Sequence, residues 1–202
     1  MSSTASNHFV GAVQRNARSK PNKTALTFLN DKCQEIQWFT YAELWLYSHN
    51  LAHQLLHQYH LKKGDRACIV YTPGLDFIIA LLACFRLGVI VVSVYPPNPA
   101  RLEEDVPKFS RFIEDSGTRI ALTTKAFKRI VGISTKLKSK VHWPEGLEWL
   151  ATDSYDRNDA NRCPNYEGQD DVGRTAVNCA IVDVWPTLED GDLLFIQYTS
   201  GN

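Results

Sequence analysis

The sequence predicts an α/β fold with a mixed, largely parallel sheet and flanking helices. Short runs of β-branched residues alternate along the chain with longer segments whose apolar residues recur at helical spacing. This is the order of strand–helix–strand units. The β-branched runs are apolar throughout, as expected of strands that helices cover on both faces. The 202 residues, 44% of them hydrophobic, suffice for one ordinary domain with a buried core.

The first part of the chain predicts a helix, a hairpin and a second helix. The two strands of the hairpin lie around the turn Asn30-Asp31. Thr40 and Glu43 have the spacing of a capping box, in which each side chain bonds the backbone N–H of the other residue, so a helix begins here. In chain order the elements are a helix over 9–20, strands over 24–29 and 35–39, and a helix over 40–59.

A strand–helix–strand unit follows between residues 66 and 94, and Gly88 divides it. Residues before Gly88 favour a helix that begins at Pro73, and the β-branched residues after it favour a buried strand. A membrane span over 77–95 is the alternative, but Arg86 lies in its middle, where a charge costs about 2.5–3.5 kcal/mol. We therefore expect a helix, a strand and no transmembrane segment.

The second half continues this alternation and is then interrupted. Gly117 ends a helix that Pro107 is expected to kink. Residues 152–180 are rich in Asp, Asn, Gly and Arg and have no apolar period, which predicts a surface loop or insertion. The remaining elements are strands over 66–71, 120–123, 147–151 and 193–198, and helices over 102–116 and 125–130.

Charge and cysteine content argue against several classes of function. Lys plus Arg and Asp plus Glu each number 22, which argues against nucleic acid or an anionic membrane as the main partner. The five cysteines lie at long spacings without a C-x-x-C string, which disfavours a disulfide framework and a zinc site. Together with an N-terminus that lacks a secretory signal, they indicate the cytoplasm. The sequence contains no motif string of hydrolases, metalloproteases or dinucleotide-binding proteins.

The sharpest candidate site is the point where the predicted strand over 193–198 runs into Thr199, Ser200 and Gly201. The two hydroxyl groups can donate hydrogen bonds, and successive backbone N–H groups in a glycine turn form a nest for anions. A bound polyphosphate needs this kind of cradle. A strand that simply ends in a polar turn is the alternative interpretation of the same residues.

Three motifs occur in order along the chain. They are FTYAEL at 39–44, a helix–Gly–strand–Pro segment at 85–97, and QYTSG at 197–201. In this order they resemble the core motifs of the adenylate-forming (AMP-binding) superfamily. VSVYPPNPARL at 92–102, taken with FIQYTSG, is most similar to the fatty acyl-AMP ligase and long-chain acyl-CoA synthetase branch. The resemblance implies that residues 1–202 are the N-terminal part of an AMP-binding domain, and so an incomplete adenylate-forming ligase fold.

The resemblance also implies a chemistry. A fatty or other carboxylic acid reacts with ATP in the presence of Mg²⁺ to give an acyl-adenylate, and the acyl group passes to a thiol of CoA or an acyl carrier protein. Thr199, Ser200 and Gly201 would contact the β- and γ-phosphates of ATP, and no residue is assigned to catalysis or to a metal. The later motifs of the family would follow Asn202, so we expect these 202 residues alone to be inactive. The alternative is a catalytically dead, truncated module that acts in binding or protein interaction.

Two polar clusters each have an ordinary and a more specific interpretation. His49, His53, His57 and His60 recur at helical spacing, which occurs in metal sites, but a solvated helix face is the expected explanation. The run 125–140 has six basic residues and no acidic one. A charged helix surface is the default there, and contact with phosphate or an acidic carrier protein is the alternative.

Overall fold

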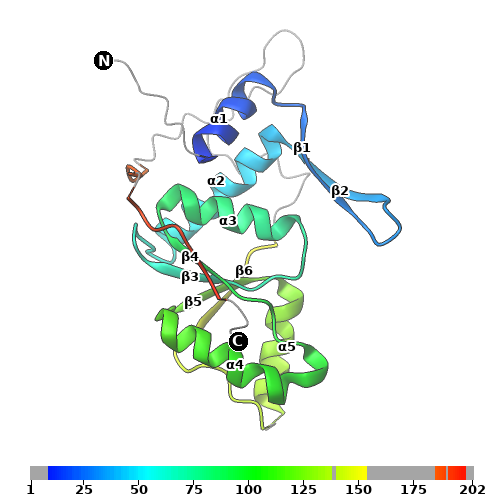
Figure 1. Cartoon of the computed structure of the whole chain (residues 1–202), viewed down its shortest axis with the longest axis vertical. Helices are drawn as coiled ribbons and strands as arrows, with labels where there is room; N and C mark the ends of the chain where they lie inside the picture. Colours follow the sequence, from blue (N-terminus) through cyan, green and yellow to red (C-terminus); the bar gives the residue numbers. More distant parts are fainter. Residues whose placement is uncertain (1–8, 138–139, 154–184, 190, 199–202) are drawn as a thin grey trace.

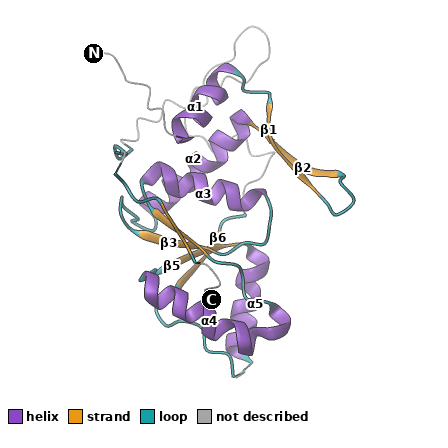
Figure 2. Cartoon of the chain, in the orientation of Figure 1, coloured by secondary structure: helices purple, strands orange, loops and turns teal. Residues whose placement is uncertain are grey.

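Five parallel strands form a central sheet between two layers of helices (Figure 1). The computed structural model describes residues 9–137, 140–153, 185–189 and 191–198. The helices are α1 (Phe9–Ser19), α2 (Tyr41–His57), α3 (Leu75–Leu87), α4 (Leu102–Ser116) and α5 (Lys125–Lys136), with a short 3-10 helix η1 (Pro99–Arg101) before α4. The strands are β1 (Thr24–Leu29), β2 (Glu35–Thr40), β3 (Arg66–Ile69), β4 (Ile90–Ser93), β5 (Ile120–Thr123), β6 (Glu148–Ala151) and β7 (Phe195–Gln197). Helices α1 to α3 lie on one side of the sheet, and α4 and α5 lie on the other (Figure 2).

The strand pairing confirms the predicted fold class. The sheet has the order β6-β5-β3-β4-β7, and every neighbouring pair is parallel. β1 and β2 are antiparallel and form a hairpin of their own, which projects away from the helices (Figure 1). The two strands predicted around Asn30-Asp31 therefore exist, but they do not join the central sheet.

The start of α2 follows the predicted capping box. The backbone N–H of Thr40 donates to Oε2 of Glu43 over 2.8 Å, and the backbone N–H of Glu43 donates to Oγ1 of Thr40 over 3.2 Å. Each of these N–H groups would otherwise lack a partner within the helix. The turn of the hairpin is held in a similar way, because Oδ1 of Asn30 accepts the backbone N–H groups of Lys32 and Gln34.

The segment predicted as helix, glycine and strand forms α3, Gly88 and β4. Gly88 ends the helix in the left-handed conformation, with φ of 65°. A Cβ atom at this position would lie 2.8 Å from Cγ of Lys63, so both the backbone and the space require glycine. The beginning of α3 differs from the prediction. Gly74 is the N-cap, and its extended backbone separates Pro73 from the first helical residue.

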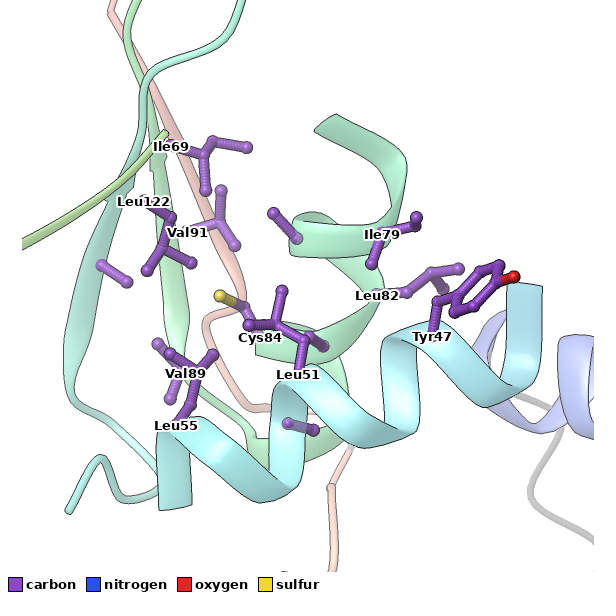
Figure 3. Close-up of a cluster of buried hydrophobic side chains, with 14 of the residues drawn as sticks. Tyr47, Leu51, Leu55, Ile69, Ile79, Leu82, Cys84, Val89, Val91 and Leu122 are labelled. Carbon is purple, nitrogen blue, oxygen red and sulfur yellow. The ribbon is translucent and has the colours of Figure 1, made fainter. Parts of the chain in front are cut away.

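The core lies on both faces of the sheet, which explains why its strands are apolar without alternation. Adjacent residues of β3, Cys68 and Ile69, point to opposite faces, and both are buried. Figure 3 shows the cluster between the sheet and helices α2 and α3, which includes Tyr47, Leu51, Leu55, Ile69, Ile79, Leu82, Cys84, Val89, Val91 and Leu122. The cluster on the other face, under α4 and α5, includes Cys68, Val70, Val92, Phe109, Ile113, Phe127 and Val131.

Several element ends also differ from the prediction, since β3 ends at Ile69 rather than 71 and α2 ends at His57 rather than 59. β7 has only three residues instead of the predicted 193–198, and it is the edge strand next to β4. α5 continues to Lys136 rather than 130, because Val131 and Ser134 extend its buried face by another turn. Within the described ranges, no helix is long and apolar enough to cross a membrane.

Candidate functional site

The carboxyl ends of the parallel strands meet at one edge of the sheet, which is where α/β folds of this type bind ligands. β4 ends at Ser93 and leads into a turn in which Tyr95 is exposed while Val94, Pro96 and Pro97 are buried. The buried neighbours hold the backbone of this turn and leave the Tyr95 ring open to solvent. This turn corresponds to the Pro-containing end of the second predicted motif.

The last strand, β7, ends at the same edge. In the register of the parallel β4–β7 pair, Ser93 lies opposite Gln197, so the chain leaves β7 beside the end of β4. The candidate site residues Thr199, Ser200 and Gly201 lie outside the described residues. Their phosphate contacts therefore stay a prediction.

Tyr198 fixes the point from which these three residues depart. Its hydroxyl donates to Oδ2 of Asp115 over 2.6 Å, and its ring lies 4.6 Å from the ring of Phe112. Loss of contact with water, followed by the neighbouring Asp115 carboxylate, raises the pKa of Tyr198. The phenol therefore stays protonated near neutral pH and acts as a donor, which holds the end of β7 against α4.

A second set of polar groups joins the carboxyl ends of β3, β5 and β6. The hydroxyl groups of Tyr71 and Thr152 lie 2.5 Å apart, and Oγ1 of Thr123 donates to the carbonyl oxygen of Val70 over 2.7 Å. Burial raises the pKa of Tyr71 above its usual range, so this group stays neutral. These bonds hold neighbouring strand ends together, and the sequence alone gave no signal for them.

Two carboxyl groups lie near this edge. Oδ1 of Asp153 accepts the backbone N–H of Lys125 over 2.9 Å at the start of α5. Asp76 stands in the first turn of α3, and burial, followed by the charge of Asp153, raises the pKa of Asp76. Among the described residues, no three His, Cys, Asp or Glu side chains gather as a metal site would require.

Arg86 and His49 form a buried cluster between α2 and α3, and this corrects the prediction of a solvated histidine face. His49 is 3% exposed and Arg86 is 5% exposed, and Nη2 of Arg86 lies 3.0 Å from Nδ1 of His49. Nη1 of Arg86 donates to the carbonyl oxygen of Trp45 over 3.1 Å, and the guanidinium group lies 3.6 Å from the centre of the Trp45 ring. The prediction holds for His57 and His60, which are exposed.

The segment that approaches β7 is attached to the layer of α2 and α3. The ring of Trp185 packs edge-on against the ring of His49, 5.2 Å between centres. Nζ of Lys63 lies 2.7 Å from Oδ2 of Asp192 and donates to the carbonyl oxygen of Thr187 over 2.9 Å. The backbone N–H of Glu189, followed by Lys63, lowers the pKa of Asp192. These contacts position the described residues before β7, as Tyr198 positions its end.

A groove of about 730 Å³ lies at the opposite edge of the sheet. It runs between α4 and residues 140–145, and its floor includes Gly117 and Thr118, which precede β5. Acidic and basic side chains line it together, among them Glu103, Arg119 and Lys140, which are exposed. The groove lies at the amino ends of the strands, so it is separate from the carboxyl edge where Ser93 and Gln197 lie.

The sequence matches the family described as AMP-binding enzyme over residues 13–202. The medium-chain-fatty-acid–acyl-carrier-protein ligase JamA of Moorena producens is 23% identical over 196 residues, which cover 96% of this chain and 28% of JamA. Disco-interacting protein 2 homolog A of Homo sapiens is 30% identical over 119 residues, which cover 59% of this chain and 8% of that protein.

A solved structure supports the same relationship. The fatty acyl-adenylate ligase from L. pneumophila, in complex with acyl adenylate and pyrophosphate, aligns with a TM-score of 0.58 at 28% identity. The alignment covers 73% of this chain and 23% of that one. The chain thus spans less than a third of the length of each of these relatives.

Proposed function

The chain belongs to the AMP-binding enzyme family, the adenylate-forming ligases, and from this premise we propose that it is the N-terminal part of a fatty-acid ligase. The proposed reaction is the ATP-dependent activation of a fatty acid as an acyl-adenylate. A thiol of CoA or of a carrier protein then attacks the acyl carbonyl, a thioester forms, and AMP leaves. The names of JamA and of the L. pneumophila enzyme support the fatty-acid substrate and the adenylate intermediate.

One structural observation carries this proposal. The parallel pairing of β4 with β7 brings the turn after Ser93 and the strand end at Gln197 to the same carboxyl edge, and these are parts of two of the three family motifs. Parallel α/β sheets bind ligands at this edge. A phosphate loop must start from a fixed strand end, and the Tyr198–Asp115 hydrogen bond supplies such an anchor.

In the proposed reaction, this part of the enzyme binds the phosphates of ATP. The carboxylate of the fatty acid attacks the α-phosphate of ATP, and pyrophosphate leaves. Because both reactants are anionic, catalysis depends on positioning them and on neutralising their charge. In the proposal, the hydroxyl groups of Thr199 and Ser200 and the backbone N–H of Gly201 hold the β- and γ-phosphates. Mg²⁺ bound to ATP would neutralise phosphate charge, and no described residue is assigned to it.

The extent and location of the protein are part of the same proposal. Residues 1–202 form the N-terminal part of the AMP-binding domain, with 152–180 as an insertion in it. The three cysteines among the described residues, Cys33, Cys68 and Cys84, are free thiols, which is compatible with a cytoplasmic protein. The 202 residues alone do not catalyse adenylation in this proposal, because they represent under a third of the relatives' length.

The test is to express the open reading frame that encodes this chain through to its stop codon. We expect pyrophosphate release from ATP that depends on an added fatty acid, and none from residues 1–202 alone. Ser200→Ala in the longer product should reduce kcat/KM for ATP by about 10–100-fold, as expected for one lost hydrogen bond to a charged group. A reading-frame product that releases no pyrophosphate with any fatty acid would contradict the ligase assignment.

A second candidate function is a binding module without catalysis. The similarity to Disco-interacting protein 2 homolog A favours it, because that protein is named for an interaction. The same experiment separates the two candidates. A reading frame that stops after Asn202 and yields a folded, inactive product supports the binding module.

A further inference from the structure

Helix α5 presents a basic surface that the proposed nucleotide site does not use. Its 12 residues contain no acidic side chain. Its cationic side chains are exposed and lie on the helix face away from the sheet. We call this surface the basic face; it consists of Lys125, Lys128, Arg129 and Lys136.

The orientation of the basic face is fixed. Phe127 and Val131 on the opposite side of α5 are buried in the core cluster under the sheet. Nε1 of Trp143 donates to Oγ of the buried Ser134 over 2.9 Å, which ties the helix to the chain that follows it. α5 therefore cannot rotate to hide its cations without exposing its core residues.

No ion pair among the described residues neutralises the basic face. Within the described ranges, the ion pairs join Lys63 with Asp192, and Arg101 and Lys108 with Asp105; none reaches α5. The nearby carboxylate of Asp153 binds the backbone N–H of Lys125 at the helix start. Four like charges on three turns of helix repel one another, so an acidic partner would be favoured electrostatically.

Two apolar side chains border the basic face. Ile133 is 52% exposed and Leu137 is 72% exposed, and they are neighbours one helical turn apart. Cations next to a small apolar strip complement an acidic amphipathic helix of another protein. They fit a membrane less well, because the larger apolar side of α5 is already buried and the protein has a net charge of zero.

The position of α5 connects the basic face with the proposed site. Lys125 follows directly after Thr124, which caps the helix at the carboxyl end of β5. The helix then runs about 18 Å away from that edge. A protein that docks along it would hold one end at the edge where the acyl-adenylate forms, which is where an acceptor thiol has to arrive.

We infer that the basic face, with Ile133 and Leu137, docks an acidic helix of the carrier protein that accepts the acyl group. This inference rests on the proposed function, and it selects a carrier protein over CoA as the acceptor. For the basic run 125–140, it favours contact with an acidic carrier protein over a charged helix surface without a partner.

The test measures the affinity of the whole chain for an apo acyl carrier protein, which lacks the pantetheine arm, by biolayer interferometry at low and high salt. We expect binding that weakens as salt rises. The double variant Lys128→Glu/Lys136→Glu should bind about tenfold more weakly, because two attractions become repulsions. Leu137→Ser should weaken binding about threefold, with the salt dependence unchanged.

The matched control reverses two exposed cations on α4, in the variant Lys108→Glu/Arg111→Glu. It should bind the carrier within about twofold of the original chain, which excludes a simple net-charge effect. Circular dichroism of each variant checks that it is folded. Equal loss of affinity in both double variants, or the absence of any carrier binding, would overturn the inference.

Three further outcomes separate this inference from neighbouring ones. The original chain can bind anionic phosphatidylglycerol vesicles while the α5 double variant does not, with the carrier affinity of the two unchanged. That result would identify the basic face as a membrane-binding surface and overturn carrier docking. The reading-frame product can release pyrophosphate in the presence of a fatty acid while the α5 double variant binds the carrier as tightly as the original chain. That result would overturn docking and would still support the ligase function. A chain that binds the carrier through α5, in a protein without adenylation activity, would support docking and contradict only the proposed reaction.

Discussion

The phenol hydroxyl of Tyr198 donates a hydrogen bond of 2.6 Å to Oδ2 of Asp115, and this bond joins the end of β7 to α4. The two residues are 83 positions apart in the sequence. The bond is supported by the contact between the rings of Tyr198 and Phe112. It holds Tyr198, the residue after β7, against α4.

Tyr198→Phe tests the importance of this bond for stability. The change removes the hydroxyl group and keeps the ring, so the free energy of unfolding should fall by roughly 1 kcal/mol. Urea denaturation followed by circular dichroism measures the difference. Tyr95→Phe is the matched control, because Tyr95 is exposed at the same edge and should leave the free energy of unfolding unchanged. Equal effects of the two changes would show that the Asp115 bond is unimportant.

Gly88→Ala should destabilise the protein by about 1–3 kcal/mol. The position has φ of 65°, and the new Cβ would lie 2.8 Å from Cγ of Lys63 and 3.0 Å from Cδ2 of Leu188. Thermal denaturation measures the effect. Gly132→Ala is the control in the interior of α5, where a Cβ meets no atom within 4 Å, and it should stabilise the protein by up to about 1 kcal/mol. Destabilisation by both changes would contradict this explanation.

Arg86→Met should lower the free energy of unfolding by about 2–3 kcal/mol. The change leaves the carbonyl oxygen of Trp45 and Nδ1 of His49 without the hydrogen bonds that Arg86 donates, and it removes the cation from the Trp45 ring. Urea denaturation followed by circular dichroism measures the difference in stability. Arg111→Met replaces an exposed arginine on α4 and should change stability by less than about 0.5 kcal/mol. A similarly small effect of Arg86→Met would mean that the buried cluster contributes little.

Asp76 makes stability depend on pH, because burial and then Asp153 raise its pKa in the folded state. A carboxyl group with a raised pKa stabilises the fold while it is protonated. This contribution is complete below the unfolded pKa of about 3.9 and is lost as pH rises through the folded pKa. As pH rises from about 4 to 7, the free energy of unfolding should therefore fall less for Asp76→Asn than for the original chain.

Urea midpoints at several pH values across that window measure the difference. Asp31→Asn is the control for the chemical change itself, since Asp31 is exposed in the hairpin turn. The first turn of α3 also favours a carboxylate through the helix dipole, an effect of opposite sign. Equal slopes for Asp76→Asn and the original chain would show that the dipole offsets the effect of burial.

Structural features that depend on residues close together in the sequence could be predicted from the sequence alone. The capping box of Thr40 and Glu43 is local, and the structure confirms both of its hydrogen bonds. The role of Gly88 is also local, because a helix former on one side and a β-branched run on the other require a turn between them. The apolar strands correctly predicted a sheet covered on both faces, since this pattern follows from burial alone.

Features that depend on tertiary contacts could not be predicted in this way. A helical wheel of α2 places His49 away from the main apolar stripe, but Arg86 of α3 and Trp185 pack against that side. The exposure of His57, two turns further on, was predicted correctly because nothing in the described structure covers the end of α2 there. At the candidate site, the motif order indicated Thr199, Ser200 and Gly201, while the Asp115 anchor of Tyr198 required the fold.

The position of β7 has a practical consequence for work with this chain in solution. Within the described residues, β7 hydrogen-bonds to β4 on one side, and its other side is open. An open strand is a template onto which extended peptides can anneal, including the same strand of another molecule. Preparations of the isolated chain should therefore self-associate as concentration rises. A short synthetic peptide that pairs with β7 would suppress this and would serve as an additive during purification.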